Sequence, residues 1–193
     1  MGFTGLPASA AWRHVTATEG FESVFFTTMP GGHRVAGGSA GVEEGQAWAV
    51  RYAIELDEGW RTRTAQVSGA SALGEHDVRL EGDGDGHWWV DGESAPGLDG
   101  CFDVDLEPSA CTNSFPVRRL RLRVGESAAA PAAYVRSFDL RVERLEQDYA
   151  RMDDAGGHQR YDYRSPEFGF ACVLVYDASG LALDYPGIAT RAL

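Results

Sequence analysis

The stretch LDGCFDVDLEPSACTNSFPVRRLRLRV, residues 98–124, decides the fold. Its first half alternates apolar and acidic residues, and a period of two is typical of a strand with one buried and one exposed face. The apolar members are Phe102, Val104 and Leu106, and the acidic members are Asp103, Asp105 and Glu107. We therefore predict a strand whose acids lie on its outer, solvated face.

The second half of this stretch predicts a corner and then a short helix. Proline does not continue a central strand, so the strand should break at Pro108. Thr112-Asn113 can cap a helix, and Pro116 then falls in its first turn. The predicted helix carries two consecutive arginines, Arg118 and Arg119.

This arginine pair is the sharpest functional signal in the chain. Consecutive helical residues point about 100° apart, so one of Arg118 and Arg119 can face the interior. A buried arginine needs a carboxylate, several carbonyls or an anionic ligand. Two interpretations stay open. One is a structural pair with an acid such as Asp103 or Asp105, and the other is a fork that binds a phosphate or carboxylate head group.

Strands dominate the rest of the sequence. The clearest alternation runs over 48–56 and turns at 57–59 into a return strand over 60–67. Further strands are expected over 12–15, 21–27, 33–36, 78–81, 87–90, 134–142, 161–163, 168–176 and 181–185. No repeating βαβ pattern occurs, which argues against a Rossmann or barrel enzyme fold. We predict one mainly antiparallel β domain over residues 1–193, curled around a single helix.

Some segments carry more specific expectations. Glycines at 37, 38 and 41 predict a flexible or bulged connection, and residues 125–130 look small and flexible. The phase of the alternation slips within 134–149, which indicates a bulge or a bend, with a helix as the alternative. Residues 168–176 are apolar on both faces and predict a doubly buried strand, and Pro186 should end the sheet.

The composition fits a folded domain and disfavours some partners. The chain has 193 residues, of which 44% are hydrophobic, and its net charge of −12 disfavours binding to nucleic acid or an anionic membrane surface. Neither a signal peptide nor an apolar stretch long enough to span a membrane is evident. The three cysteines, at 101, 111 and 172, form no CxxC pair and fit core thiols in a reducing compartment. We therefore expect a cytoplasmic protein.

Several other motifs have both a structural and a functional interpretation. Residues 82–86, GDGDG, resemble part of a calcium loop but lack its distal acid, so we expect a solvated turn. The scattered histidines lack the spacing of a zinc site. Paired carboxylates on the strand over 103–107 can serve glycoside hydrolysis, although alternating acids also wet an outer face. The five tryptophans fill a sheet core or line a lipid or sugar cavity.

The same central residues resemble the putative glycolipid-binding family of bacterial proteins. That family's pattern is close to DGCxDVDL followed by TNTLPIRRL, and this chain reads DGCFDVDL at 99–106 and TNSFPVRRL at 112–120. Similar pieces follow the family's order at 57–62, 86–92, 147–149, 161–163 and 177–186. The resemblance implies a spiral β-roll, a long antiparallel sheet wrapped around one α-helix, similar to bacterial lipoprotein carriers. It also implies a homodimer, and it brings no established catalytic residues.

We therefore expect a non-enzymatic protein that holds a glycolipid or another amphiphile between the curved sheet and the helix. The candidate ligand-binding residues are Asn113, Arg118 and Arg119 for the polar head, Trp48, Trp60 and Trp88 for the apolar part, and Tyr149. Two alternatives remain: a sugar or lipid hydrolase that uses acids of the strand over 103–107, and a structural dimer module without a ligand. No metal, cofactor, nucleic acid or membrane insertion is expected.

Overall fold

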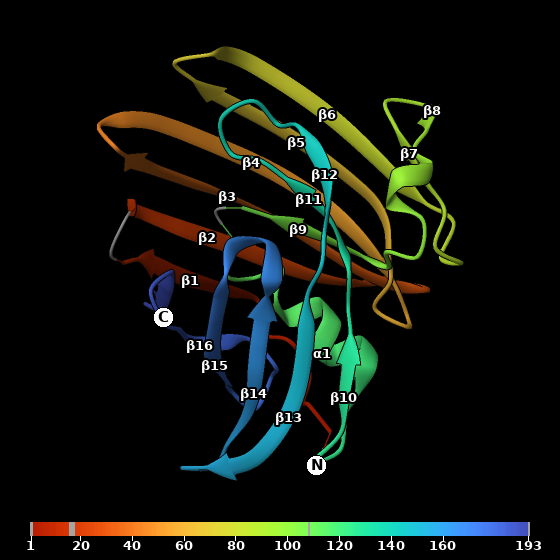
Figure 1. The fold of residues 1–193 in the computed structure, drawn as a ribbon, viewed down its shortest axis with the longest axis vertical. Helices are drawn as coiled ribbons and strands as arrows, with labels where there is room; N and C mark the ends of the chain where they lie inside the picture. Colours follow the sequence, from red (N-terminus) through yellow and green to blue (C-terminus); the bar gives the residue numbers. More distant parts are fainter. Residues whose placement is uncertain (1, 16–17, 108, 193) are drawn as a thin grey trace.

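The protein, described here by a computed structural model over residues 2–15, 18–107 and 109–192, is mainly β (Figure 1). The described residues form a large antiparallel sheet of 14 strands, which is not closed, and a separate sheet of three strands. In these ranges, every helix is too short or too polar to cross a membrane.

The large sheet holds most of the strands. In chain order they are β1 (Ser9–His14), β2 (Thr18–Met29), β3 (Gly32–Glu43), β4 (Gln46–Asp57), β5 (Thr62–Ser71), β6 (Gly74–Gly82), β7 (Trp88–Val90), β8 (Glu93–Ser94), β10 (Ser127–Ala129), β13 (Asp148–Ala155), β14 (His158–Ser165), β15 (Phe170–Tyr176), β16 (Ala182–Tyr185) and β17 (Ala189–Arg191). The small sheet contains β9 (Asp103–Leu106), β11 (Ala132–Val135) and β12 (Val142–Leu145). Two short 3-10 helices span Pro96–Leu98 and Pro166–Phe168.

The order of the strands brings distant parts of the chain together. From one edge to the other it is β10-β13-β14-β15-β16-β17-β1-β2-β3-β4-β5-β6-β7-β8. Strand β1 therefore lies between β2 and β17, with Trp12 opposite Arg191. In the small sheet β9 runs parallel to β11, the one parallel pairing among the described strands. The sheet thus has an N-terminal part and a C-terminal part that meet at β1 and β17.

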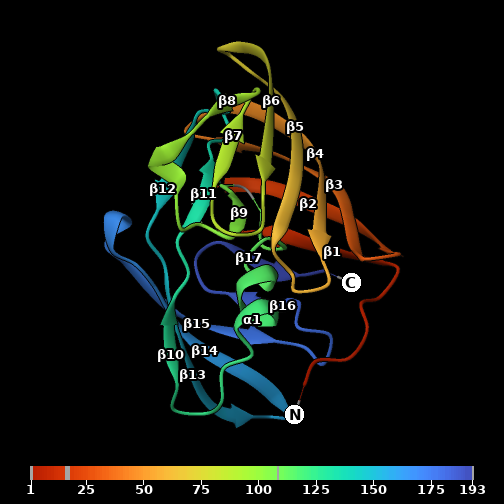
Figure 2. The ribbon, with the colours of Figure 1, turned by 90° about the vertical axis from the view of Figure 1, so that its right-hand side faces the viewer.

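The predicted helix is confirmed as α1 (Ser114–Leu120), with Asn113 at the N-cap and Pro116 in the first turn. Its buried residues are Ser114, Phe115, Pro116, Val117 and Arg118. The carbonyl of Asn113 accepts a hydrogen bond from the hydroxyl of Tyr176 on β15, at 3.0 Å. Figure 2 shows α1 on the hollow side of the curved sheet.

The alternation over residues 48–56 is also confirmed. Strand β4 buries every second residue, and the return strand is β5. The buried side chains of β4 are Trp48, Val50, Tyr52, Ile54 and Leu56. Of the three cysteines, Cys101 and Cys111 are buried and Cys172 is half-buried, and none is in a disulfide.

The prediction that the acids of β9 lie on an outer, solvated face is wrong. Strand β9 is buried on both faces, with Asp103 only 2% exposed and Asp105 only 8%. The acids face polar partners from other segments rather than water, among them Arg119 of α1. The predicted corner at Pro108 lies outside the described residues.

The prediction of a flexible or bulged connection at glycines 37, 38 and 41 is also wrong, because β3 pairs with β2 and β4 without interruption. Gly37 lies opposite Tyr52, and a Cβ on Gly37 would lie 3.1 Å from the Tyr52 ring and 2.5 Å from the carbonyl oxygen of Ser23. The absent side chain leaves room for Tyr52, whose hydroxyl donates to the fully buried Glu22 at 2.6 Å. The glycine therefore serves packing rather than flexibility.

Four expectations for the C-terminal part differ from the structure. Residues 125–130 include β10, which pairs with β13 at the edge of the sheet. The slip after residue 134 is a turn between β11 and β12, with Leu140 at a φ of 55°, so the segment is neither one bulged strand nor a helix. The sheet continues beyond Pro186, because β17 pairs with β1. The predicted doubly buried strand over 168–176 is also wrong, because β15 fully buries only Leu174 and Tyr176.

Candidate functional site

A hollow of about 650 Å³ lies beside the C-terminal end of α1. We name it the arginine pocket, because its lining includes Arg118, Arg121, Arg123 and Arg151. Asp154 is the one acid among its described lining residues. The less polar part of the wall comes from Phe3, Trp60, Leu122, Val124 and Tyr161. A locally cationic hollow therefore exists in a chain whose net charge is −12.

The end of α1 determines where these arginines lie. Arg121 adopts a left-handed conformation, with φ 50° and ψ 41°, and its N–H donates to the carbonyl of Val117 at 3.2 Å. The chain then leaves the helix along the rim of the pocket. Backbone hydrogen bonds of 2.8 Å fix this segment to β13, from Gly125 to Arg151 and from Arg151 to Glu126. Two chain segments, residues 118–123 and β13, thus deliver their arginines to one hollow.

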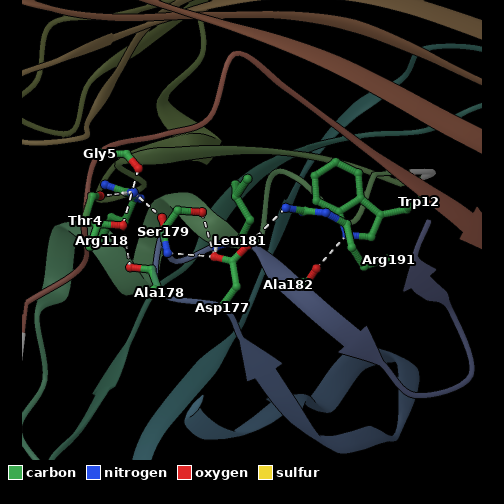
Figure 3. A network of polar contacts seen from close by, with 10 residues as sticks. All are labelled: Thr4, Gly5, Trp12, Arg118, Asp177, Ala178, Ser179, Leu181, Ala182 and Arg191. Atoms are coloured by element: carbon green, nitrogen blue, oxygen red, sulfur yellow. Dashed lines mark hydrogen bonds and ion pairs between the residues drawn. The ribbon is translucent and has the colours of Figure 1, made fainter. Parts of the chain in front are cut away.

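Arg118 lies at the base of the pocket and is 7% exposed. Its Nη2 donates to the carbonyl of Thr4 at 2.9 Å and to that of Ser179 (Figure 3). It makes no ion pair with any described residue. Burial lowers the pKa of Arg118 to about 10, while the charge of Asp177 acts in the opposite direction. Asp177 is itself paired with Arg191 at 3.0 Å.

Two aromatic rings enclose the Arg118 guanidinium. Its carbon lies 4.2 Å from the centroid of the Trp60 ring and 5.5 Å from that of Phe3. His33 also stacks on Trp60, with 4.5 Å between ring centroids. Burial, followed by the charge of Arg118, lowers the pKa of His33. An arginine held by carbonyls and aromatic faces is neutralised by no carboxylate, so it stays available to an anion.

Trp60 has an unusual backbone conformation, with a φ of 67°. A bulky residue in the left-handed region is rare and strained, and such strain is found mainly at functional sites and tight turns. The surrounding turn is fixed by hydrogen bonds between Asp57 and Arg61 and between Trp60 and Asp57. In this turn the Trp60 ring, which is 5% exposed, lies against Arg118.

The other arginines differ in exposure. Arg121 and Arg123 are exposed at the rim, and neither makes an ion pair with a described residue. Arg151 is 5% exposed, pairs with Asp154 and donates to the carbonyl of Met152. The pocket therefore has two buried arginines at its base and two solvated ones at its rim.

The structure separates the two arginines of the predicted fork. Arg119 binds Asp103 through two N–H groups, with Nε 3.1 Å from Oδ1 and Nη2 2.6 Å from Oδ2. Burial raises the pKa of Asp103, and Arg119 opposes this effect. Arg119 therefore has the geometry of the structural interpretation, and only Arg118 of the pair lines the arginine pocket.

Two of the other candidate residues line smaller hollows on β9 and β11. Trp48 lines one of about 230 Å³, and Asn113 lines one of about 180 Å³. Both hollows are lined by Glu107, Tyr134, Phe168 and Ile188. Trp48 and Asn113 thus line pockets other than the one that Arg118 lines.

The remaining candidates are buried in the core. Tyr149 is fully buried and accepts a hydrogen bond from Nδ2 of Asn113 at 2.9 Å. Trp88 is 2% exposed and donates from Nε1 to the carbonyl of Cys101 at 2.9 Å. The predicted seven residues are therefore distributed over several places, and only Arg118 and Trp60 meet in one pocket.

The acids of the β9 segment already have partners within the chain. Asp105 accepts from Oγ1 of Thr112 at 2.6 Å and from Nε2 of Gln147 at 2.5 Å, and burial raises its pKa to about 6. Glu107 accepts from Arg136 at 2.9 Å and from the backbone N–H of Ser137 at 2.7 Å. In the described part of the chain, no group of three or more His, Cys, Asp and Glu could hold a metal ion.

Most residues of the arginine pocket were not predicted from the sequence. The run RRLRLR at 118–123 contains four of the seventeen arginines, so its local charge could have pointed to Arg121 and Arg123. Nothing local marks Arg151 or Phe3, which reach the pocket through pairing of β10 with β13 and through the contact of Thr4 with Arg118. The buried Glu22 was also missed, because it stands in an ordinary alternating strand.

The comparisons with known proteins agree with the fold. A family model described as "Putative glycolipid-binding" matches residues 9–191. A DUF1089 family protein from Pseudomonas aeruginosa has 32% sequence identity and a TM-score of 0.77, covering 99% of this chain and 98% of that chain. A β-barrel-like protein of the DUF1849 domain from Brucella abortus has 10% identity and a TM-score of 0.55, covering 98% and 96%, and shows likeness of fold alone. The search of curated proteins gave no match.

Proposed function

Because this chain belongs to the putative glycolipid-binding family, we propose that it binds a glycolipid or a related amphiphile, without catalysis. The polar head of the ligand lies in the arginine pocket, beside Arg118. The apolar part contacts Trp60 and the neighbouring apolar wall. This assignment keeps two of the residues that the sequence singled out.

The observation that carries this proposal is the composition of the arginine pocket. Guanidinium groups at the base and rim can bind oxygen atoms of a polar head. Phe3, Leu122 and Val124 supply apolar surface within the same hollow of about 650 Å³. The pocket thus combines convergent polar groups with apolar surface, as the two ends of an amphiphile require.

We also propose a more specific description of the fold. An open antiparallel sheet with α1 on its hollow side supports a spiral β-roll wound around that helix. The β-barrel-like structure of similar fold supports the same architecture. In this fold the arginine pocket, which residues of α1, β13 and β14 line, would hold the ligand beside the helix.

We propose no catalysis because the acids that could act as a general acid or base already have partners within the chain. Asp103 is paired with Arg119, and each carboxylate oxygen of Asp105 and Glu107 accepts a hydrogen bond from this chain. A general acid or base must be free to exchange a proton with the substrate. We therefore prefer binding to hydrolysis.

The assembly and the location are proposals as well. Phe21 and Phe25 lie on one face of β2, with exposed fractions of 46% and 62%, opposite the buried Val24. Exposed aromatic residues on one face support a contact with a second copy. We propose a homodimer in the cytoplasm, which sedimentation velocity and cell fractionation test.

Native mass spectrometry of protein purified from its own host, followed by lipid extraction, tests the binding function. We expect a stoichiometric amphiphile that is reduced in the R121A/R123A double variant. The matched control is R13A/R164A, which removes two exposed arginines outside the pocket. Ligand-free wild-type protein, which also takes up no glycolipid or fatty acyl compound when these are supplied, would overturn the proposal.

A further inference from the structure

We infer that the arginine pocket takes a ligand that carries a phosphate group, on a lipid head or on a small phosphate ester. This inference rests on the proposed use of the same pocket as the binding site. It adds the chemical class of the head group, which a glycolipid need not contain.

The charge of the pocket is the first argument. Four arginines and one aspartate line it, so its lining carries a net charge of about +3. The C-terminal end of α1 contributes only about half a negative charge in return. A carboxylate brings one negative charge, whereas a phosphate monoester brings about 1.5 to 2 at neutral pH. The phosphate therefore compensates the pocket more completely.

The unused hydrogen-bond donors are the second argument. Arg118 uses Nη2 for the carbonyls of Thr4 and Ser179, while its Nη1 has no acceptor among the described residues. Arg121 and Arg123 likewise make no ion pair with a described residue. Guanidinium groups match the oxygen atoms of phosphate, and several of them can share one phosphate group.

Isolation of this charge from the rest of the surface is the third argument. The chain as a whole is strongly acidic, with a net charge of −12, so long-range attraction does not bring anions to it. Binding of an anion must then come from local contacts in the pocket. Those contacts are partly screened by salt at the exposed rim and less so at the buried base.

The test compares three kinds of vesicle made from a neutral, phosphate-free galactolipid. One is undoped, one contains phosphatidic acid, and one contains the same molar fraction of oleic acid. Glycerol 3-phosphate is titrated separately by calorimetry, because it carries the same phosphate without a lipid chain. The wild type, R121A/R123A and the control R13A/R164A are compared after lipid removal, with circular dichroism to verify folding.

We expect phosphatidic acid to increase vesicle binding on the order of 10- to 100-fold over oleic acid at equal fraction. R121A/R123A should lose most of this increase, and R13A/R164A should keep it within about twofold. Equal binding to all three vesicles would overturn the phosphate inference and leave amphiphile binding intact. The same inference would fail if R13A/R164A lost as much binding as R121A/R123A.

Two outcomes separate the sources of the phosphate. Binding to doped vesicles but not to glycerol 3-phosphate supports a lipid-borne phosphate. Tight binding of glycerol 3-phosphate without binding to any vesicle supports the phosphate inference but overturns the proposed amphiphile function. Absence of binding to every probe overturns both.

Discussion

The guanidinium carbon of Arg118 lies 4.2 Å from the centroid of the Trp60 ring, although the two residues belong to distant segments. Arg118 is in the last turn of α1, and Trp60 is in the turn between β4 and β5. The same guanidinium donates to carbonyls of Thr4 and Ser179. One side chain thus connects the N-terminal segment, the N-terminal part of the sheet, the helix and the turn before β16.

Replacing Arg118 with Lys should reduce the free energy of unfolding by about 1–3 kcal/mol. Lysine keeps the charge but lacks the planar group that stacks on Trp60 and bonds two carbonyls at once. Urea unfolding measures the effect. Arg13→Lys, at an exposed position, should change stability by no more than about 0.5 kcal/mol, and equal losses in both variants would refute the special role of Arg118.

The buried pair of Asp103 and Arg119 should show strong coupling in a double-mutant cycle. Asp103→Asn and Arg119→Met should each cost on the order of 3–5 kcal/mol, because each leaves an unpaired partner in a site where Asp103 is 2% exposed. The double variant should lose much less than the sum of the single losses. Additive losses in urea unfolding would mean that the pair contributes little.

Asp105 should make stability fall as pH rises. Its pKa is about 6 in the folded protein, against 3.8 for an unperturbed group, because burial outweighs the hydrogen bonds from Thr112 and Gln147. Between these pH values the folded state holds more protons than the unfolded state, so deprotonation weakens folding by up to roughly 3 kcal/mol.

The Asp105→Asn variant lacks this titration. Its free energy of unfolding should rise relative to the wild type as the pH increases from below 4 to 7, which urea titrations at several pH values measure. Asp153→Asn, an exposed control, should run parallel to the wild type. Parallel curves for Asp105→Asn as well would exclude the raised pKa.

Gly37→Ala should destabilise the protein by on the order of 1–3 kcal/mol. Its new Cβ would lie 2.5 Å from the carbonyl oxygen of Ser23 and 3.1 Å from the ring of Tyr52. The matched control is Gly97→Ala, because a Cβ there meets nothing within 4 Å. Thermal unfolding measures both, and a Gly37→Ala protein as stable as the control would show that Tyr52 can move at little cost.

The local sequence pattern was sufficient to predict those elements that pack one face on the apolar core and expose the other to water. The alternation of β4 and the proline signal of α1 are of this kind, whereas the side chain of Asn113 makes no cap hydrogen bond and donates to Tyr149. The acids of β9 show where such reasoning ends. Alternation normally means an exposed face, but Asp103 and Asp105 meet Arg119, Thr112 and Gln147 from other segments. Only the tertiary structure specifies those partners.

The same limit applies to the candidate site. The sequence identified Arg118 and Trp60 but gave no means of separating Arg118 from Arg119, because a buried structural arginine and a ligand-binding arginine are the same residue type. Their different partners follow from the roughly 100° between successive helical side chains. The contribution of Arg151 depends on the pairing of β10 with β13, which links residues far from α1 in the sequence.

The pairing of β1 with β17 has a consequence for synthesis on the ribosome. Within the run from β1 to β8, each strand pairs with its neighbours in the chain, so these pairings can form as the strands emerge. The other side of β1 stays open until residues 189–191 are made, and the carbonyl of Ser179 reaches Arg118 only shortly before that. The nascent chain therefore carries an unpaired strand edge for most of its translation, and the contacts that hold Arg118 form late.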